Sequence, residues 1–245
     1  MKVCAAQFRP VTGDFDSNIA RHLELIQLAV EQGAHLVFFP ELSITGYEPR
    51  LAKLLACDPL DERLNILQSY SDKYRLLIGV GLPINITSGV QIGMVWFSPY
   101  EPRLTYAKQQ LHTDENPYFV AGIEQLILNS GRYKFAPAIC YESLLMKHAD
   151  SAAAQQADVY LASVAKSNSS MSKAVEHYPA IANKLGMYVI MANCVGVCDD
   201  FVSVGQSGVW SFSGKLLASL DSESEGIVIL DIEHGVASVH KLSDR

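Results

Sequence analysis

The order of two kinds of apolar pattern constrains the fold of this chain more than any other feature of its sequence. Short, nearly continuous apolar runs, typical of buried strands, alternate with stretches in which apolar residues recur every three or four positions, typical of helices that face a core. The first run, 2–8, is followed by a helical pattern that begins at the capping residues 14–16 and ends at Gly33. From residue 188 onward, strand-like runs dominate. This order predicts a layered α/β fold with one mixed sheet or two sheets.

The same patterns predict the individual elements. Strands are expected at 2–8, 36–39, 76–81, 91–97, 104–107, 133–139, 159–162, 188–192, 202–205, 209–212, 215–220 and 227–232. Helices are expected at 14–33, in a stretch after Gly46, and at 60–74, 143–156 and 172–185. No low-complexity linker, repeat period or shift in composition divides the chain, so we expect a single domain over residues 1–245.

Composition and charge narrow the class of protein. The chain is 49% hydrophobic and 18% charged, which supports a large core and excludes a disordered chain. Its net charge is −7 and it has no basic run, so we expect no nucleic-acid partner and no membrane partner. The apolar run at the start is too short for a signal peptide, and no run approaches the ~18 residues of a membrane span. The five cysteines are scattered, which indicates a reducing compartment and a cytoplasmic protein.

Three reactive side chains follow directly after predicted strands. Glu41 comes after the run 36–39 and a proline, Lys108 after 104–107, and Cys140 after 133–139. Strand ends are where α/β sheets collect catalytic groups, because rigid strands aim side chains into a shared crevice. These three groups suit acyl transfer. The carboxylate takes the thiol proton, the thiol is the nucleophile, and the ammonium stabilises the oxyanion.

Two interpretations of Cys140 stand side by side at this point. A cysteine at the end of an apolar strand is more often a small buried hydrophobe than a nucleophile. However, the polar step Tyr141–Ser143 predicts a sharp turn into a helix, whose N-terminus favours both a thiolate and an oxyanion. Glu41 and Lys108 also have a non-catalytic interpretation: Glu41 as a solvated acid in a loop, and Lys108 as a surface lysine. The residues alone leave the choice open.

Longer motifs around these residues resemble those of the nitrilase, or carbon–nitrogen hydrolase, superfamily. Phe39–Tyr47 (FPELSITGY) resembles its glutamate motif, Lys108–His112 followed by Glu115 its lysine motif, and Ala138–Glu142 (AICYE) its cysteine motif. Met191–Gly196 (MANCVG) also matches. The three motifs occur in the order of that family, and the resemblance covers the chain from the first strand to about residue 220.

The resemblance implies a fold, an assembly and a chemistry. The fold is a four-layer αββα sandwich, with two mixed β-sheets flanked by helices, and subunits pair into a homodimer or a higher homo-oligomer. Glu41 is the general base, Cys140 the nucleophile and Lys108 the stabiliser of the tetrahedral intermediate, with the backbone N–H of Tyr141 beside it. Glu115 positions Lys108. The substrates are a small amide and water, the intermediate is a thioester, and neither a metal nor an organic cofactor is required.

Some neighbouring residues are expected to influence which substrate is bound rather than the reaction itself. Tyr47, Tyr141 and Glu142 are expected to line the pocket, and Glu142 is also expected to cap the helix after Cys140. Tyr141 favours amide over nitrile cleavage, because nitrile-cleaving members more often carry tryptophan there. The segment 143–149 departs from that of many amidases, which leaves the substrate contacts open. A nitrile or N-carbamoyl hydrolase of the same superfamily, and a non-catalytic binding or assembly protein, stay as alternatives.

Other short patterns have simpler explanations. Ser163–Lys166 and Ser170–Lys173 both fit Ser-x-x-Lys, but the motifs that accompany this pattern in serine enzymes are missing, and a polar loop before a helix explains them. The family resemblance implies that this segment, which follows a strand end, lines the substrate pocket. Cys194 and Cys198 do not have the spacing of a zinc pair. Of the dispersed histidines, His112 lies closest to a reactive residue.

Overall fold

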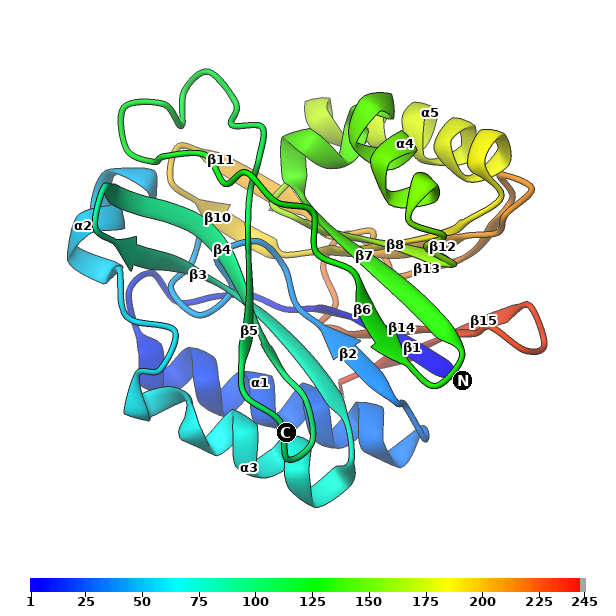
Figure 1. Cartoon of the computed structure of the whole chain (residues 1–245), viewed down its shortest axis with the longest axis horizontal. Helices are drawn as coiled ribbons and strands as arrows, with labels where there is room; N and C mark the ends of the chain where they lie inside the picture. Colours follow the sequence, from blue (N-terminus) through cyan, green and yellow to red (C-terminus); the bar gives the residue numbers. More distant parts are fainter. Residues whose placement is uncertain (243–245) are drawn as a thin grey trace.

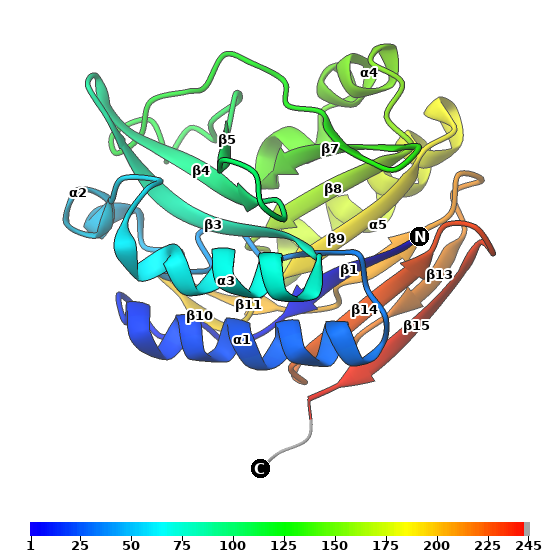
Figure 2. The same cartoon turned by 60° about the horizontal axis from the view of Figure 1, so that its bottom comes forward.

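Two β-sheets pack face to face, and helices cover the outer side of each, in the computed structural model, which describes residues 1–242. Helices α1 and α3 lie on one outer face and α4 and α5 on the opposite one (Figures 1 and 2). The layers follow the order helix, sheet, sheet, helix. The predicted αββα sandwich with two mixed sheets is therefore confirmed.

The first sheet has seven strands in the spatial order β15-β14-β1-β2-β3-β4-β5. β1, β2 and β3 are parallel, and the remaining neighbours are antiparallel. β2 and β5 therefore run in the same direction, and their carboxyl ends lie at the same edge. The strands are β1 (Lys2–Gln7), β2 (Leu36–Phe38), β3 (Leu77–Ile86), β4 (Gly89–Phe97), β5 (Leu104–Ala107), β14 (Gly226–Asp231) and β15 (Val236–Lys241).

The second sheet has six strands in the spatial order β13-β12-β9-β8-β7-β6. β7, β8 and β9 are parallel, so the residues that follow these three strands lie at one edge. A separate hairpin, β10 (Val195–Cys198) and β11 (Phe201–Val204), follows β9. The strands are β6 (Leu128–Ser130), β7 (Tyr133–Ile139), β8 (Val159–Val164), β9 (Tyr188–Asn193), β12 (Gly208–Trp210) and β13 (Leu216–Ser219).

The helices begin and end at residues that suit their caps. The Asp14 side chain accepts a hydrogen bond from Ser17 N, 3.0 Å away, at the start of α1, and Gly33 just beyond its end has φ +74°. Gly186 closes α5 in the same left-handed conformation. The helices are α1 (Phe15–Glu31), α2 (Ala52–Leu55), α3 (Asn65–Tyr74), α4 (Met146–Ala154) and α5 (Asn168–Leu185), and 3-10 turns cover Pro49–Leu51, Glu62–Leu64 and Cys140–Leu144.

Three apolar clusters fill the spaces between the layers. One lies between the two sheets and includes Trp96 and Leu161. The second lies between the first sheet and helices α1 and α3, and the third between the second sheet and helices α4 and α5. The central strands are buried on both faces, which explains why their sequences are continuous apolar runs rather than alternating ones. Within residues 1–242, no helix has both the length and the apolar character that a membrane span requires.

Several predicted boundaries are wrong for identifiable reasons. The helix predicted at 60–74 begins as a 3-10 turn and becomes α3 only at Asn65, and the helix predicted at 143–156 is a 3-10 turn followed by α4. α5 begins four residues before the predicted position, 172, in a serine-rich segment that favours capping over a helix interior. β6, β10 and β15 were not predicted, because they are short or largely exposed and lack a continuous apolar run.

Candidate active site

The three predicted reactive side chains come together where the two sheets meet. Glu41 lies in the turn after β2 and Lys108 directly follows β5, so both belong to the same edge of the first sheet. Cys140 directly follows β7 of the second sheet. A hydrogen bond from Ser163 Oγ to Phe39 O, 2.8 Å long, joins the sheets nearby. The site is therefore shared between the sheets.

Lys108 forms a buried ion-pair network with two carboxylates. Its Nζ lies 2.7 Å from Glu41 Oε1 and 2.6 Å from Glu115 Oε1. Glu115 also accepts hydrogen bonds from Tyr47 Oη, at 3.0 Å, and from His112 N, at 2.7 Å. An ammonium has three protons, so two of them hold Lys108 in place and one stays available to a further acceptor.

Burial changes the proton affinities in this network. Burial raises the pKa of Glu41 to about 7; the Lys108 ammonium lowers that pKa and the Glu115 charge adds to the rise. Burial alone lowers the pKa of Lys108, but the neighbouring carboxylates outweigh it, so Lys108 stays protonated. Glu41 Oε2 is buried and has no hydrogen-bond partner within residues 1–242. The Glu41 carboxylate thus has one free oxygen and a pKa suited to proton transfer near neutral pH.

Cys140 lies at a strained turn. Its φ is +45°, in the left-handed region that side chains other than glycine seldom adopt, and its thiol donates to Ala165 O, 3.8 Å away. Burial and the Glu41 carboxylate raise the pKa of Cys140 to about 12, and the Lys166 and Lys108 ammonium groups oppose that rise. The thiol is therefore neutral at rest. The helix expected to start here is a five-residue 3-10 turn, so the helix dipole contributes little to the sulfur.

Glu142 ties the Cys140 turn to the Lys108 segment. Its buried side chain is absent from the lining of the cavity described below, although we expected a pocket residue. The expected capping interaction is present, because the Glu142 side chain accepts the N–H of Ile139, the residue just before the turn. Burial raises the pKa of Glu142. The donors to Oε1 are Tyr106 Oη at 2.5 Å and Ile139 N at 2.8 Å, and those to Oε2 are Gln109 N at 2.6 Å and Gln110 N at 3.2 Å.

The Glu41 turn lies directly against β3. Ile44 N donates to Gly81 O, 2.9 Å away, and Leu42 has φ +51°. A Cβ added at Gly81 would lie 2.5 Å from Leu42 N and 2.7 Å from Pro40 O. Only a residue without a side chain allows the turn to approach the strand this closely.

A cavity of about 260 Å³ opens above the cysteine, which is small for a ligand site. Four predicted residues line it, namely Tyr47, Glu115, Cys140 and Tyr141. Glu41 and Lys108 are 2% and 1% exposed and lie outside this lining. The segment after Ser163 was expected to line the pocket, and it does so through Ala165, Lys166, Ser167, Ser170 and Lys173. The lining also includes residues that the sequence did not single out, namely Asp114, Leu144 and Phe201, together with His112, which pairs with Asp114.

Lys166 is a further lysine at the site. It is 1% exposed, and two positions before it β8 ends, just as β5 ends before Lys108. A lysine shortly after a predicted strand is the same signal that indicated Lys108, and it could have identified Lys166. Ser163, the other end of that Ser-x-x-Lys match, is fully buried and bonded to Phe39 O, which leaves no role for it as a nucleophile.

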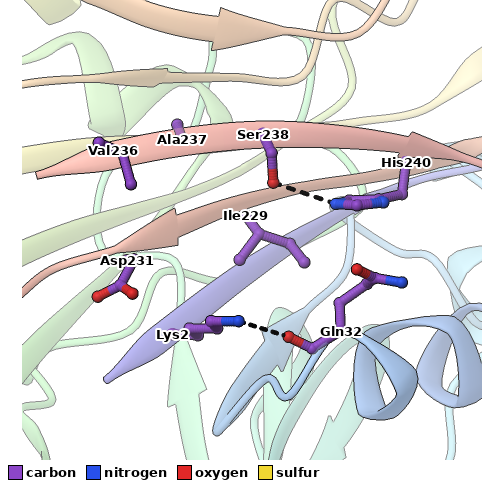
Figure 3. A pocket seen from close by; sticks show the side chains of 8 residues that line it. All are labelled: Lys2, Gln32, Ile229, Asp231, Val236, Ala237, Ser238 and His240. Carbon is purple, nitrogen blue, oxygen red and sulfur yellow. Dashed lines mark hydrogen bonds between the residues drawn. The ribbon is translucent and has the colours of Figure 1, made fainter. Parts of the chain in front are cut away.

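Two further features lie apart from the nucleophile. Cys194 and Cys198 are buried, with their sulfur atoms 3.4 Å apart. A second cavity, of about 200 Å³, lies between β1, β14, β15 and the end of α1 (Figure 3). There the Lys2 ammonium donates to the backbone carbonyl of Gln32, 2.9 Å away, and Ser238 bonds to His240, so these three side chains are already partnered.

Known proteins resemble the chain in sequence and in fold. It is 28% identical over 95% of its length to the glutamine-dependent NAD(+) synthetase of Thermotoga maritima, and 25% identical over 91% to that of Acinetobacter baylyi. The chain spans 42% of the length of each of these relatives. The solved structure of an amidase from Nesterenkonia sp. AN1 superposes with a TM-score of 0.87 at 24% identity, covering 94% of this chain and 92% of that one.

The family follows from the match along the chain itself. The model of the carbon–nitrogen hydrolase family matches residues 2–241, which include both sheets and every residue of the site described above. The resemblance inferred from the motifs is therefore confirmed, and this chain belongs to the carbon–nitrogen hydrolase family.

Proposed function

We propose that the protein is an amidase that hydrolyses a small primary amide to a carboxylic acid and ammonia through a thioester on Cys140. One observation carries the proposal: the Lys108 ammonium lies between Glu41 and Glu115, at 2.7 and 2.6 Å, beside a thiol that lines a small cavity. A buried thiol, a base with a free oxygen and a fixed cation are the groups that acyl transfer requires.

The first step forms the thioester. Because the thiol is neutral at rest, its proton moves to Glu41 Oε2 as the sulfur attacks the carbonyl carbon. The carbonyl oxygen becomes an oxyanion, which accepts one hydrogen bond from the third N–H of the Lys108 ammonium and another from the backbone N–H of Tyr141. That N–H belongs to the first turn of a helix and has no acceptor within it. Glu41 then gives its proton to the amide nitrogen, the C–N bond breaks and ammonia leaves.

The second step releases the acid. A water molecule takes the place of ammonia. Glu41 accepts a proton from this water while the water oxygen attacks the thioester carbon. The same two donors stabilise the second oxyanion. The C–S bond then breaks, the proton returns to sulfur, and the acid departs. One water is consumed and one ammonia is formed in each cycle, and Glu41 and Cys140 end as they began.

The size of the cavity and the relatives support an amide as the substrate. A volume of about 260 Å³ suits an acyl group of a few carbon atoms rather than a large ligand. The related Nesterenkonia amidase was solved with butyramide bound. The related synthetases are named glutamine-dependent, and glutamine carries a primary amide.

An ammonia-release screen tests the proposal. Primary amides of two to six carbons, nitriles and N-carbamoyl compounds are each incubated with the wild type and with Cys140→Ala. We expect ammonia from amides with the wild type alone, and a mass increase on Cys140 equal to the acyl group during turnover. Preference for nitriles or N-carbamoyl compounds would replace the amide assignment, and no turnover of any class would indicate a non-catalytic protein. Activity in Cys140→Ala would exclude the mechanism.

A further inference from the structure

Lys166 is a buried lysine whose side-chain nitrogen has no partner among the other residues of the described chain. It is 1% exposed and lines the cavity together with Cys140. Within residues 1–242, its ammonium makes neither a hydrogen bond nor an ion pair, whereas Lys108 makes two of each. An isolated buried ammonium is costly in free energy, and a counter-ion removes most of that cost. Burial accordingly lowers the pKa of Lys166, and an anion placed beside it would stabilise its charged form.

The backbone of Lys166 is held firmly in place. Its N–H donates to Asn193 Oδ1, 2.8 Å away. Its carbonyl accepts hydrogen bonds from Ser203 Oγ at 3.0 Å, Val204 N at 3.1 Å and Asn193 Nδ2 at 3.3 Å. Four hydrogen bonds therefore fix the backbone of this one residue. The position of the ammonium at the cavity is thus a property of the scaffold.

The carboxylates of the cavity are already engaged elsewhere. Glu115 holds Lys108, and Asp114 pairs with His112. The Cys140 thiol is neutral at rest and supplies no lasting negative charge. Lys166 therefore has no anionic neighbour on the cavity wall that is free to pair with it within the described chain.

The surroundings of Lys166 favour an anion. Ser167 and Ser170, at the start of α5, line the cavity beside it, and Lys173 lines it from an exposed position one turn further along. The first N–H groups of an 18-residue helix lack intrahelical acceptors, and its N-terminus attracts negative charge. Hydroxyl groups, free N–H groups and two ammonium groups form one side of the cavity.

We propose that Lys166 binds a carboxylate on the acyl part of the substrate, so that the preferred substrates are amides whose acyl chain ends in a carboxylate, the monoamides of small dicarboxylic acids. This inference rests on the proposed amidase function and deepens it. The paired ammonium of Lys108 serves the reacting carbonyl, and the unpaired ammonium of Lys166 selects the far end of the molecule. Lys166 then acts as a specificity-determining residue rather than as a part of the acyl-transfer chemistry.

A matched pair of substrates tests the inference without any mutation. Glutaramate and pentanamide have the same number of carbons and the same amide, and they differ in a terminal carboxylate. We expect the wild type to prefer glutaramate by about 100-fold in kcat/KM, the effect typical of a buried charge pair. Equal kcat/KM for the two compounds would overturn the inference and leave the amidase function intact. Release of ammonia from neither these two compounds nor any other amide would instead overturn the proposed function.

Variants then assign the preference to Lys166. In Lys166→Met, kcat/KM for glutaramate is expected to fall about 100-fold, mainly through KM, with pentanamide changed by less than about threefold. Lys184→Met is the matched control, because this exposed lysine near the end of α5 lies outside the cavity lining, and a loss of less than about threefold is expected for either substrate. Equal losses for both substrates in Lys166→Met, together with slower iodoacetamide labelling of Cys140, would overturn the inference in favour of a role on the thiol.

Discussion

The two sheets contribute two different halves to one site. The half from the first sheet, with Glu41, Lys108 and the nearby Glu115, pairs its charges within the protein at 2.6–2.7 Å. The half from the second sheet, with Cys140 and Lys166, holds a neutral thiol and an ammonium without a partner in residues 1–242. Lys108 and Lys166 are both 1% exposed, so the difference between the two lysines does not arise from solvent.

The contrast separates stability from recognition. Paired charges keep their geometry with or without substrate, which suits the groups that must meet the transition state. An unpaired charge raises the free energy of the empty protein and lowers that of the complex, which suits a group that selects its ligand. The four predictions below test whether the two halves behave in these two ways, and they run from the largest expected effect to the smallest.

Glu41→Gln should cause the greatest loss of activity. Glutamine cannot accept the thiol proton, so kcat is expected to fall about 10³-fold, within the range for loss of a general base. Its amide can still accept from Lys108, and the fold should survive. Steady-state ammonia release measures the loss, and Glu176→Gln, at an exposed position on α5, is the control. Retention of more than a tenth of the activity would assign the base to another group.

Removal of the two lysines should change stability in opposite ways. Lys108→Met leaves two buried carboxylates next to each other, and the free energy of unfolding is expected to fall by about 3–5 kcal/mol. Lys166→Met removes a charge that had no partner, so the free energy of unfolding should stay equal or rise. Urea unfolding of both variants measures the difference. Similar losses in the two would show that Lys166 is paired after all, and the contrast between the halves would disappear.

The ionisation of Glu41 should affect stability and activity in opposite directions. Its pKa rises from 4.5 to about 7 on folding, mainly through burial. Below pH 4.5 the Glu41 carboxyl is protonated in both the folded and the unfolded protein. Between pH 4.5 and about 7 only the folded protein keeps this proton, so the stability that the protonated carboxyl provides is lost as the pH rises through this range. The base becomes active over the same range, and kcat/KM should rise to an inflection near pH 7.

The comparison with Glu41→Gln isolates this group. The wild type should lose free energy of unfolding relative to Glu41→Gln as pH increases from 5 to 8, in urea titrations at each pH. A difference that is constant over this range would mean that the Glu41 carboxyl has an ordinary pKa in the folded protein.

Glu142→Gln tests the connection between the halves and should have the smallest effect of the four. Glutamine has one acceptor oxygen in place of two, and its NH₂ group would face backbone N–H donors. We expect kcat to fall about tenfold with KM unchanged, because Lys108 and Cys140 shift relative to each other. Separate kcat and KM values for an amide check this, with Glu176→Gln again as the control. An increase in KM alone would place Glu142 in substrate binding.

Reactive residues were predictable where a strand end and a longer motif coincided. Glu41, Lys108 and Cys140 each follow an apolar run, and the structure brings all three to one place. Lys166 follows β8 in the same way, but its local motif suggested chance, and no pattern in a sequence reveals that a lysine is buried without a partner. The burial of a charge depends on residues distant in sequence, which periodicity does not report.

Fold elements were predictable where the chain carries a clear apolar run. The central strands were found because both of their faces pack against other layers, and β15 was missed because most of its side chains are exposed. The turn at Cys140 was expected to start an α-helix, and the 3-10 geometry follows from contacts of Glu142 with a segment more than thirty residues away. The single-domain organisation, the homo-oligomer and the cytoplasmic location stay predictions.

Gly81 has a consequence for the sequences that this fold can accept. It touches no substrate and lines no part of the cavity, yet any side chain there would displace the turn that carries Glu41. In a library with all twenty amino acids at this position, selection for ammonia release should recover glycine alone. The tolerance of a position to mutation in this protein therefore does not depend simply on its distance from the reacting atoms. A search for functional positions that examined only the cavity wall would overlook Gly81, one of the least replaceable residues.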